Sequence, residues 1–325
     1  MASMKAYMTR RLIETIIVVF FAMFVNFFII NLAPGDPARI MTGEFGYACP
    51  EYVEAMRKKW GLDKPLHERF LIYLANVLKG DLGYSYGYYS PVAQLIAERI
   101  GATLLLMLTG IMLAFVIGTL IGAQAGRKMG SKTDMTLSFI NLMLWSMPVF
   151  WLGLILILVF SVWCGFFPTS GMMSVRTEYH GMWKYLDILW HLTLPATTLA
   201  LAELPIYFKI VRASVIEQTS EEYVRTFRAV GMREDKVFKR YVLRNALVPP
   251  VTMLGLHLGY VLSGAVLIEV VFGWPGLGRL LLEAVYRRDY PVLMGMYLVT
   301  SICVALANLA TDLIYMILDP RIRYR

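Results

Sequence analysis

Long apolar blocks recur along this chain, and each is about as long as a helix that crosses a lipid bilayer. Such a helix takes about 20 predominantly apolar residues, and the first block runs from Leu12 to Leu32. Hydrophobic residues make up 58% of the 325 residues and charged residues only 17%, whereas soluble domains carry about 25% charged residues. A soluble core could not hide this much apolar surface, so the sequence predicts an integral membrane protein.

The blocks predict an all-α fold with six transmembrane helices, at about residues 10–31, 102–125, 135–163, 194–213, 247–271 and 291–318. Pro148 is expected to kink or break the third span. Lysine and arginine precede the first block, lie in the loops after the second and fourth blocks, and follow the sixth. Cytoplasmic segments carry this excess, so both the N and the C terminus are expected in the cytoplasm.

These spans divide the chain into three predicted regions. Residues 1–32 form the cytoplasmic N-terminus and the first span, residues 33–100 an external lobe, and residues 101–325 a core membrane domain with five spans. The lobe is expected to hold short helices at 51–60 and 67–78. The first block is too long for the apolar part of a signal peptide and lacks a good cleavage site, so it is expected to be retained.

The sequence gives little support for nucleic-acid binding, metal binding or nucleotide binding. The net charge of +8 resides mainly in short loops between spans, as the membrane bias predicts, so no nucleic-acid partner is expected. Cys49, Cys164 and Cys303 contain no CxxC pair, so no metal site is expected, while a disulfide between Cys49 and Cys164 stays open. Residues 126–133 fail as a P-loop because Ser131 replaces the second glycine. The chain is therefore expected to be no enzyme and to bind no nucleotide.

The loop at 214–247, on the predicted cytoplasmic side, differs from an ordinary connector. Thr219 and Glu222 have the spacing of a capping box, which predicts that a helix starts there. An apolar stripe with helical spacing follows, formed by Tyr223, Phe227 and Val230.

Gly231 then interrupts the pattern, and a second basic helix is expected from about 233 to 247. The apolar stripe of such a short, basic-flanked helix has to be shielded from water by another surface. The helix could rest on anionic lipid as an interfacial helix, or it could dock into the groove of a soluble cytoplasmic partner.

The residues of this loop resemble a known family. EYVRTFRAVG at 222–231 and YVLRNALVP at 241–249 look like the cytoplasmic "EAA" loop of binding-protein-dependent ABC importer permeases, in particular the dipeptide, oligopeptide and nickel branch. The resemblance covers nearly the whole chain, in the order typical of the family: PGDP at 34–37, GLDKP at 61–65, GDLG at 80–83, EVVFGWPGLG at 269–278 and DPR at 319–321.

The resemblance implies the permease subunit of an ATP-driven importer in a prokaryotic inner membrane. ATP and Mg would be bound by two cytoplasmic ATP-binding subunits or domains, which carry the ATPase activity. A second homologous permease subunit and an external or periplasmic solute-binding protein would complete the transporter. Di- or oligopeptides are the expected solutes, and nickel or other metal chelates and oligosaccharides remain open.

The resemblance also assigns site residues. The ATPase-coupling loop would comprise Glu222, Tyr223, Arg225, Thr226, Phe227, Arg228, Ala229 and Gly231. The motif's third position usually holds a small residue, so the bulky Phe227 suggests a partner groove shaped to suit it. An external gate or receptor-docking surface would comprise Glu269, Trp274, Pro275, Gly276 and Asp289.

Three polar residues within the predicted spans are candidates for the translocation path, namely Glu203, Asn141 and His257. A carboxylate in lipid is costly and usually faces a cavity or a partner, so Glu203 is expected to line the path or to pair with a residue of a neighbouring helix or subunit. Asn141 and His257 could equally be interhelical hydrogen-bonding groups. Glu203 is also the chief support for a rival hypothesis, an ion-coupled secondary transporter. A membrane assembly or signalling protein without transport is a third possibility.

Overall fold

The computed structural model describes residues 4–32, 51, 54, 58, 63–175, 177, 179–261 and 264–318. The chain forms two compact units, one of Met1–Gly101 with Gly276–Arg325 and the other of Ala102–Pro275. Helices dominate both units, as the sequence predicts.

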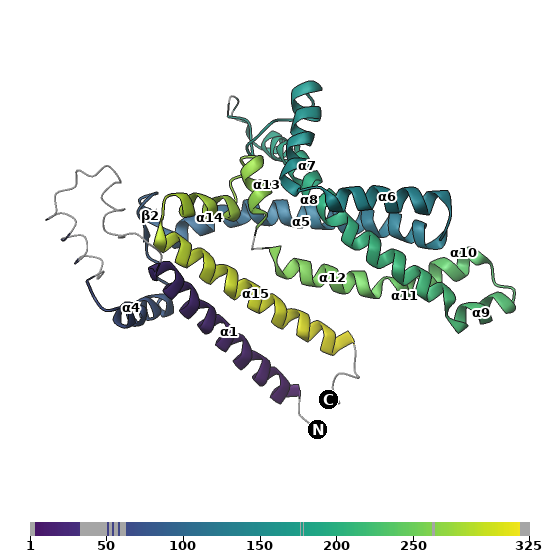
Figure 1. Cartoon of the computed structure of the whole chain (residues 1–325), viewed down its shortest axis with the longest axis horizontal. Helices are drawn as coiled ribbons and strands as arrows, with labels where there is room; N and C mark the ends of the chain where they lie inside the picture. Colours follow the sequence, from purple (N-terminus) through teal and green to yellow (C-terminus); the bar gives the residue numbers. More distant parts are fainter. Residues whose placement is uncertain are drawn as a thin grey trace. The chain divides into compact units, whose positions relative to one another are not determined.

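In the first unit, α1 (Met4–Leu32) and α15 (Tyr290–Leu318) lie side by side and run in opposite directions (Figure 1). The start of α1 and the end of α15 are therefore at the same end of the pair. Helix α4 (Leu66–Leu78) packs on α1 through the buried ring of Phe70, which makes edge contacts with Phe24 and Phe27. These three helices match the predicted elements closely.

The tyrosine-rich run adds a small strand pair that the all-α prediction omitted. Strand β1 (Tyr84–Ser85) pairs with β2 (Ser90–Pro91) in an antiparallel hairpin. A further helix, α14 (Leu277–Tyr286), packs on α15 where only a loop was expected.

The second unit is arranged around the long helix α8 (Met182–Ser220), which contacts α6, α7, α11, α12 and α13. Prolines at 195 and 205 lie within α8 without ending it. Helix α8 is longer than the predicted fourth span, because it begins before Leu194 and continues beyond Ala213.

Helix α5 (Val92–Arg127) starts at Val92 rather than at the predicted Ala102. Its later turns approach α8 closely through glycines, since a Cβ atom at Gly122 would lie 2.8 Å from the carbonyl oxygen of Phe208. Close approach of this kind is typical of small residues at helix contacts within membranes.

The predicted third span is sharply bent. Helix α6 (Lys132–Ser146) ends before Pro148. Helix α7 (Val149–Leu156) and the π-helix η1 (Ile157–Trp163) that continues it lie at an angle of 104° to α6. Proline disfavours helical geometry in the residue before it, and Met147 is extended there with φ −83° and ψ 130°.

The prediction of one continuous fifth span was wrong. Helix α12 (Val248–Gly259) ends after 12 residues, and α13 (Val266–Val271) begins after a break that contains Gly264 at φ +72°. That left-handed conformation suits glycine and ends regular helix.

Among the described residues, three helices are long and apolar enough to cross a membrane, at Thr9–Leu32, Val92–Arg127 and Tyr290–Leu309. The bent pair of α6 with α7 and η1 makes a fourth if it counts as one span. Many large apolar side chains of α1, including Ile16, Ile17 and Phe21, are exposed, as lipid contact requires.

Some predictions fall outside the described residues. Of the expected helix at 51–60, only Glu51, Glu54 and Lys58 are described, and all three are helical. The motif at 34–37, Cys49 and the tail from 319 to 325 lie outside, so a bond between Cys49 and the exposed Cys164 stays a prediction.

Candidate coupling site

The loop at 214–247 forms a helical hairpin at the end of α8. Helix α9 (Glu222–Ala229) is followed by a turn at Gly231, and then by α10 (Glu234–Val237), the π-helix η2 (Phe238–Val242) and α11 (Leu243–Ala246). Gly231 has φ +78°, and its backbone N–H donates to the carbonyl oxygen of Arg228 at 3.0 Å. The predicted helix, glycine turn and second helix are all present.

The predicted capping box is absent. The Thr219 hydroxyl donates to the carbonyl oxygen of Val215 at 2.6 Å, within α8. Helix α9 starts after Glu221, whose side chain makes no capping hydrogen bond. The capping prediction was wrong because α8 extends through Thr219 and leaves its hydroxyl to the preceding turn.

The apolar face of the hairpin differs by one residue from the predicted stripe. Val230 is 78% exposed, whereas Val224 is fully buried. The hairpin core joins Val224 to the end of α8 and to the second arm; its buried members are Ala123, Val211, Val215, Val224, Val237, Phe238, Val242 and Ala246. The hairpin is thus packed on α8 as one body.

Aromatic rings line the inside of this hairpin. The ring of Phe227 lies 4.1 Å from that of Tyr241 and 6.2 Å from that of Tyr223. The Tyr223 hydroxyl donates to Gln218 Oε1 at 2.8 Å and accepts from Asn245 Nδ2 at 3.2 Å. The bulky Phe227 therefore packs between the two arms of the hairpin, which gives it a role within the chain itself.

Ion pairs brace the hairpin from outside. Arg228 spans the turn to Glu234 with contacts of 2.6 and 3.0 Å, and this hydrogen-bonded guanidinium lowers the pKa of the Glu234 carboxyl. Arg127, at the end of α5, contacts Asp235 Oδ1 at 2.5 Å and covers the ring of Phe238.

The outward face of α9 is polar and exposed, and it consists of Glu222, Arg225, Thr226, Arg228 and Ala229. Most predicted coupling residues thus share one surface, while Tyr223 and Phe227 are partly buried beneath it.

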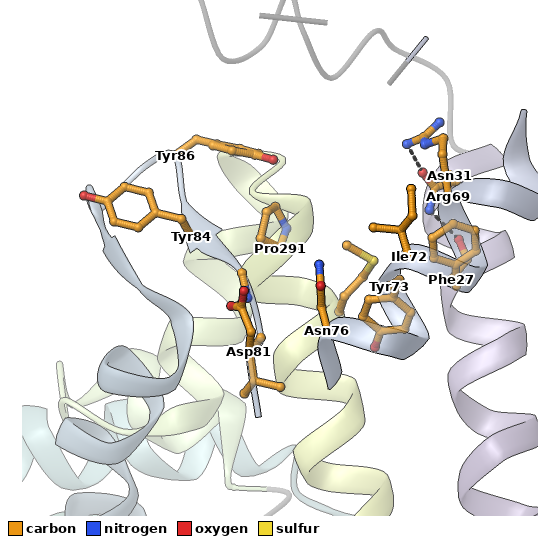
Figure 2. Close-up of a pocket in the computed structure, with 13 residues that line it drawn as sticks. Phe27, Asn31, Arg69, Ile72, Tyr73, Asn76, Asp81, Tyr84, Tyr86 and Pro291 are labelled. Atoms are coloured by element: carbon orange, nitrogen blue, oxygen red, sulfur yellow. Dashed lines mark hydrogen bonds between the residues drawn. The ribbon is translucent and has the colours of Figure 1, made fainter. Parts of the chain in front are cut away.

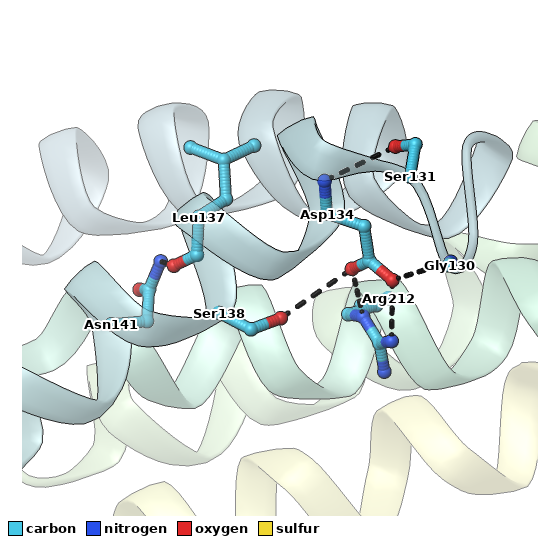
Figure 3. Close-up of polar contacts among 7 residues, drawn as sticks. All are labelled: Gly130, Ser131, Asp134, Leu137, Ser138, Asn141 and Arg212. Atoms are coloured by element: carbon cyan, nitrogen blue, oxygen red, sulfur yellow. Dashed lines mark hydrogen bonds and ion pairs between the residues drawn. The ribbon is translucent and has the colours of Figure 1, made fainter.

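A third ion pair, near the hairpin, was not predicted from the sequence. Asp134, on the first turn of α6, accepts two hydrogen bonds from Arg212 of α8, at 2.6 and 2.8 Å (Figure 3). The backbone N–H of Gly130 donates to the same carboxylate at 3.0 Å, and the Ser138 hydroxyl lies 3.4 Å away. Asp134 is only 3% exposed, so this clamp ties α6 to α8 just before the hairpin.

Two of the three path candidates meet. His257 Nδ1 lies 3.6 Å from Glu203 Oε2 and 3.1 Å from the Tyr207 hydroxyl, which joins α12 to α8. Asn141 is buried and donates to the carbonyl oxygen of Leu137 on its own helix (Figure 3).

The predicted external residues are mostly buried. In the second unit, Glu269 is fully buried and accepts from the Thr103 hydroxyl at 2.9 Å, while Trp274 Nε1 donates to the carbonyl oxygen of Ala102 at 2.8 Å. Pro275 is exposed.

In the first unit, Gly276 is buried. Asp289 is also buried, and it accepts from the Ser85 hydroxyl at 2.5 Å and from the Gly87 N–H at 2.9 Å. Its carboxylate thereby organises the strand hairpin from within.

Replacing Thr103 by valine is expected to lower the free energy of unfolding by about 1–3 kcal/mol, because the buried Glu269 carboxylate loses a hydrogen bond. Thr119, on the same helix, is the matched control, since its hydroxyl oxygen is buried and has no hydrogen-bond partner in the part of the chain that the structure describes. Thr119→Val should be neutral or stabilising. Thermal unfolding in detergent measures both, and equal effects would contradict the assigned bond.

Among the described residues, no group of three or more His, Cys, Asp or Glu side chains could hold a metal ion. The site is a polar helical hairpin joined to α8 and α5 through a buried core and ion pairs. With the long apolar helices, it defines a multi-pass membrane protein.

Comparison with known proteins agrees with this class. Residues 114–324 match the binding-protein-dependent transport system inner membrane component, and residues 4–107 match the N-terminal membrane component of the same systems. The chain therefore belongs to the family of binding-protein-dependent transport system inner membrane components, which are permeases of the bacterial inner membrane.

Relatives of full length are similar to this chain. The oligopeptide transport system permease protein AppB of Bacillus subtilis is 37% identical, over 99% of this chain and 100% of that protein. The glutathione transport system permease protein GsiC of Escherichia coli O6:H1 is 38% identical over the same shares. The dipeptide transport system permease protein DppB of Escherichia coli K12 is 37% identical over 92% of this chain and 93% of that protein.

Proposed function

We propose that this chain is the permease subunit of an ATP-driven importer of short peptides. The names of its relatives, which concern oligopeptides, dipeptides and glutathione, support a peptide solute over metal chelates or oligosaccharides. ATP and Mg are handled by two cytoplasmic ATP-binding subunits or domains. A second homologous permease subunit forms the other half of the pathway, and an external solute-binding protein delivers the peptide.

The proposed topology retains six spans with both termini in the cytoplasm. The bent α6–α7–η1 segment serves as the third span, α8 as the fourth, and α12 with α13 as a broken fifth. Two charges of α8 contact other helices in this arrangement, Glu203 through His257 and Arg212 through Asp134, as charged groups within a membrane usually do.

The observation that carries the proposal is the packing of the coupling hairpin on α8. A helix docked on its own, like an interfacial helix on lipid, needs no buried link to the spans. Here Val224 and Val237 are fully buried against Val211 and Val215 of α8. Motion of a partner bound to the exposed face of α9 is therefore transmitted directly to α8.

ATP drives such a transporter only through a difference in affinity for its inward-open and outward-open states. The partner subunits close on ATP, carry the hairpin with them, and shift the balance between these states. Glu203 and His257 lie on helices that this motion rearranges, and we place them beside the peptide path. Glu269, Trp274 and Asp289 act as internal braces of the external gate, because their side chains are buried.

An ion-coupled secondary transporter is the second candidate, favoured by the contact between Glu203 and His257. Such a carrier has no use for a cytoplasmic docking hairpin. Transport by the isolated chain along a proton gradient, without ATP, would support it over the importer.

Replacing Gly231 by valine tests the hairpin as a lever. A β-branched residue at φ +78° is strained, so the turn between α9 and α10 should deform. In the reconstituted transporter, peptide uptake per ATP hydrolysed is expected to fall by roughly tenfold, because about 1.4 kcal/mol of lost coupling has that effect.

Gly80 provides the control, since its φ is +81° and a Cβ atom there meets no atom of the described residues within 4 Å. Gly80→Val imposes similar local strain at the end of α4, which belongs to the other compact unit. Unchanged coupling in Gly231→Val, or equal loss in both variants, would refute the lever.

A further inference from the structure

A cavity of about 220 Å³ lies within the first unit, between α1, α4, the strand hairpin and α15 (Figure 2). Pockets for drug-sized ligands measure about 300–1,000 Å³, so this cavity suits a smaller molecule. It belongs to neither the coupling hairpin nor the contact between Glu203 and His257.

Two opposite charges line this cavity on different sides. Arg69 of α4 and Asp81 of the following loop both border it, and Figure 2 shows Asn76 between them. No ion pair joins the two among the described residues, although both belong to one small cavity.

Arg69 retains unused hydrogen-bonding capacity. Its Nη2 donates to Asn31 Oδ1 at 2.5 Å, and a guanidinium has five N–H donors. Burial lowers the pKa of Arg69, which means that the charged side chain is incompletely compensated. A carboxylate bound in the fork geometry would satisfy it.

Asp81 is exposed and supplies a carboxylate to the cavity lining. Its Oδ1 accepts from the backbone N–H of Gly83 at 2.8 Å, which fixes the carboxylate orientation. Each carboxylate oxygen has a further lone pair to offer, so an ammonium group can bind there.

The rest of the wall is largely aromatic and apolar. Phe27 and Tyr73 stack with ring centroids 5.6 Å apart, and Ile72 and Met294 complete this side. Such a wall suits the side chain of a ligand whose charged groups lie on either side.

We propose that this cavity binds a small zwitterion that carries an α-carboxylate and an ammonium group, namely a free amino acid. Arg69 holds the carboxylate and Asp81 the ammonium. This inference rests on the cavity alone and holds whichever solute the transporter carries.

Calorimetric titration of the full-length chain in detergent tests the proposal without ATP or transport. Leucine is the first probe, leucinamide lacks the carboxylate, and N-acetylleucine lacks the ammonium. Leucine is expected to bind roughly tenfold or more tightly than either analogue, because each loses one charge-assisted hydrogen-bonded contact. Leucyl-leucine, whose ammonium and carboxylate groups lie one residue farther apart, is expected to bind more weakly than leucine. Tighter binding of the dipeptide would contradict a free amino acid as the ligand.

Two variants assign the ends of the ligand. Arg69→Gln should abolish the preference for leucine over leucinamide, and Asp81→Asn the preference for leucine over N-acetylleucine. Lys79→Gln is the control, since Lys79 is an exposed neighbour at the end of α4 that does not line the cavity.

Several outcomes would overturn the proposal. Equal affinity of leucine and its analogues for the unaltered chain would overturn it. This comparison needs no variant, so it holds even if a variant fails to fold. Tighter binding of glycerophosphoethanolamine than of leucine would assign the cavity to a lipid head group instead. Thermal unfolding checks that Arg69→Gln and Asp81→Asn are folded. If the folded variants keep the preference for leucine over both analogues, leucine binds at a site other than this cavity.

Discussion

Replacing Asp134 by alanine is expected to lower the free energy of unfolding by about 3 kcal/mol. Removing one partner of a buried ion pair costs about 3–5 kcal/mol, because the other charge is left uncompensated. Asp134 is 3% exposed, but the Arg212 side chain keeps 31% exposure and recovers some hydration. The lower end of the range therefore applies.

Glu234→Ala provides the matched control, because it breaks another pair of carboxylate and arginine in the same unit. The side chains of Arg228 and Glu234 are 40% and 56% exposed, and exposed pairs contribute about 0–1 kcal/mol. Chemical unfolding in detergent compares the two variants. Equal losses would mean that the Asp134 clamp contributes no more than a surface contact.

The double variant Asp134→Leu with Arg212→Met separates charge from packing. It removes both charges and fills their space with apolar side chains, which is often neutral or stabilising for a buried pair. Stability should therefore recover most of the loss seen in Asp134→Ala. A double variant as unstable as the single one would show that the hydrogen bonds, rather than the isolated charge, are decisive.

Replacing Gly122 by alanine is the second prediction with a large effect, a loss of about 1–3 kcal/mol from overpacking. The added Cβ atom would lie 2.8 Å from the Phe208 carbonyl oxygen and 3.1 Å from Val211 Cβ, so backbone has to move. Gly118 and Gly126 are four residues away on either side, on the same face of α5, and a Cβ at either would also meet α8 within 3 Å.

Gly101 provides the matched control for Gly122→Ala. It belongs to α5 as well, but a Cβ atom there meets nothing within 4 Å. Alanine is a better helix former than glycine by about 1 kcal/mol, so Gly101→Ala should stabilise the chain while Gly122→Ala destabilises it. Thermal unfolding of both variants provides the measurement, and shifts of the same sign would exclude the close contact between α5 and α8.

Local patterns predicted the elements of the coupling hairpin better than its packing. Gly231 marked the turn because a left-handed residue is a local requirement that glycine meets. The predicted capping box at Thr219 is absent because α8 continues through that residue. The predicted apolar stripe included Val230, but Val230 is exposed and Val224 is the residue that faces the core. Both errors concern which neighbour a helix meets, and helical spacing alone does not contain that information.

The clamp between Asp134 and Arg212 could not be found in the sequence at all. Its members are 78 residues apart, and each alone resembles an ordinary charge at the end of a span. The contact between Glu203 and His257 was foreseen only as an unspecified pairing with another helix.

The amino-acid sequence by itself determined that this chain lies in a membrane, that it belongs to a permease family, and where its hairpin turns. Apolar length, basic loops and glycine positions are properties of short segments, so no knowledge of folding was needed. Only the tertiary structure decided where the spans bend or break, which carboxylates are buried, and which charges meet. Those features depend on residues far apart in the chain, whose desolvation and contacts exist only once the helices have packed.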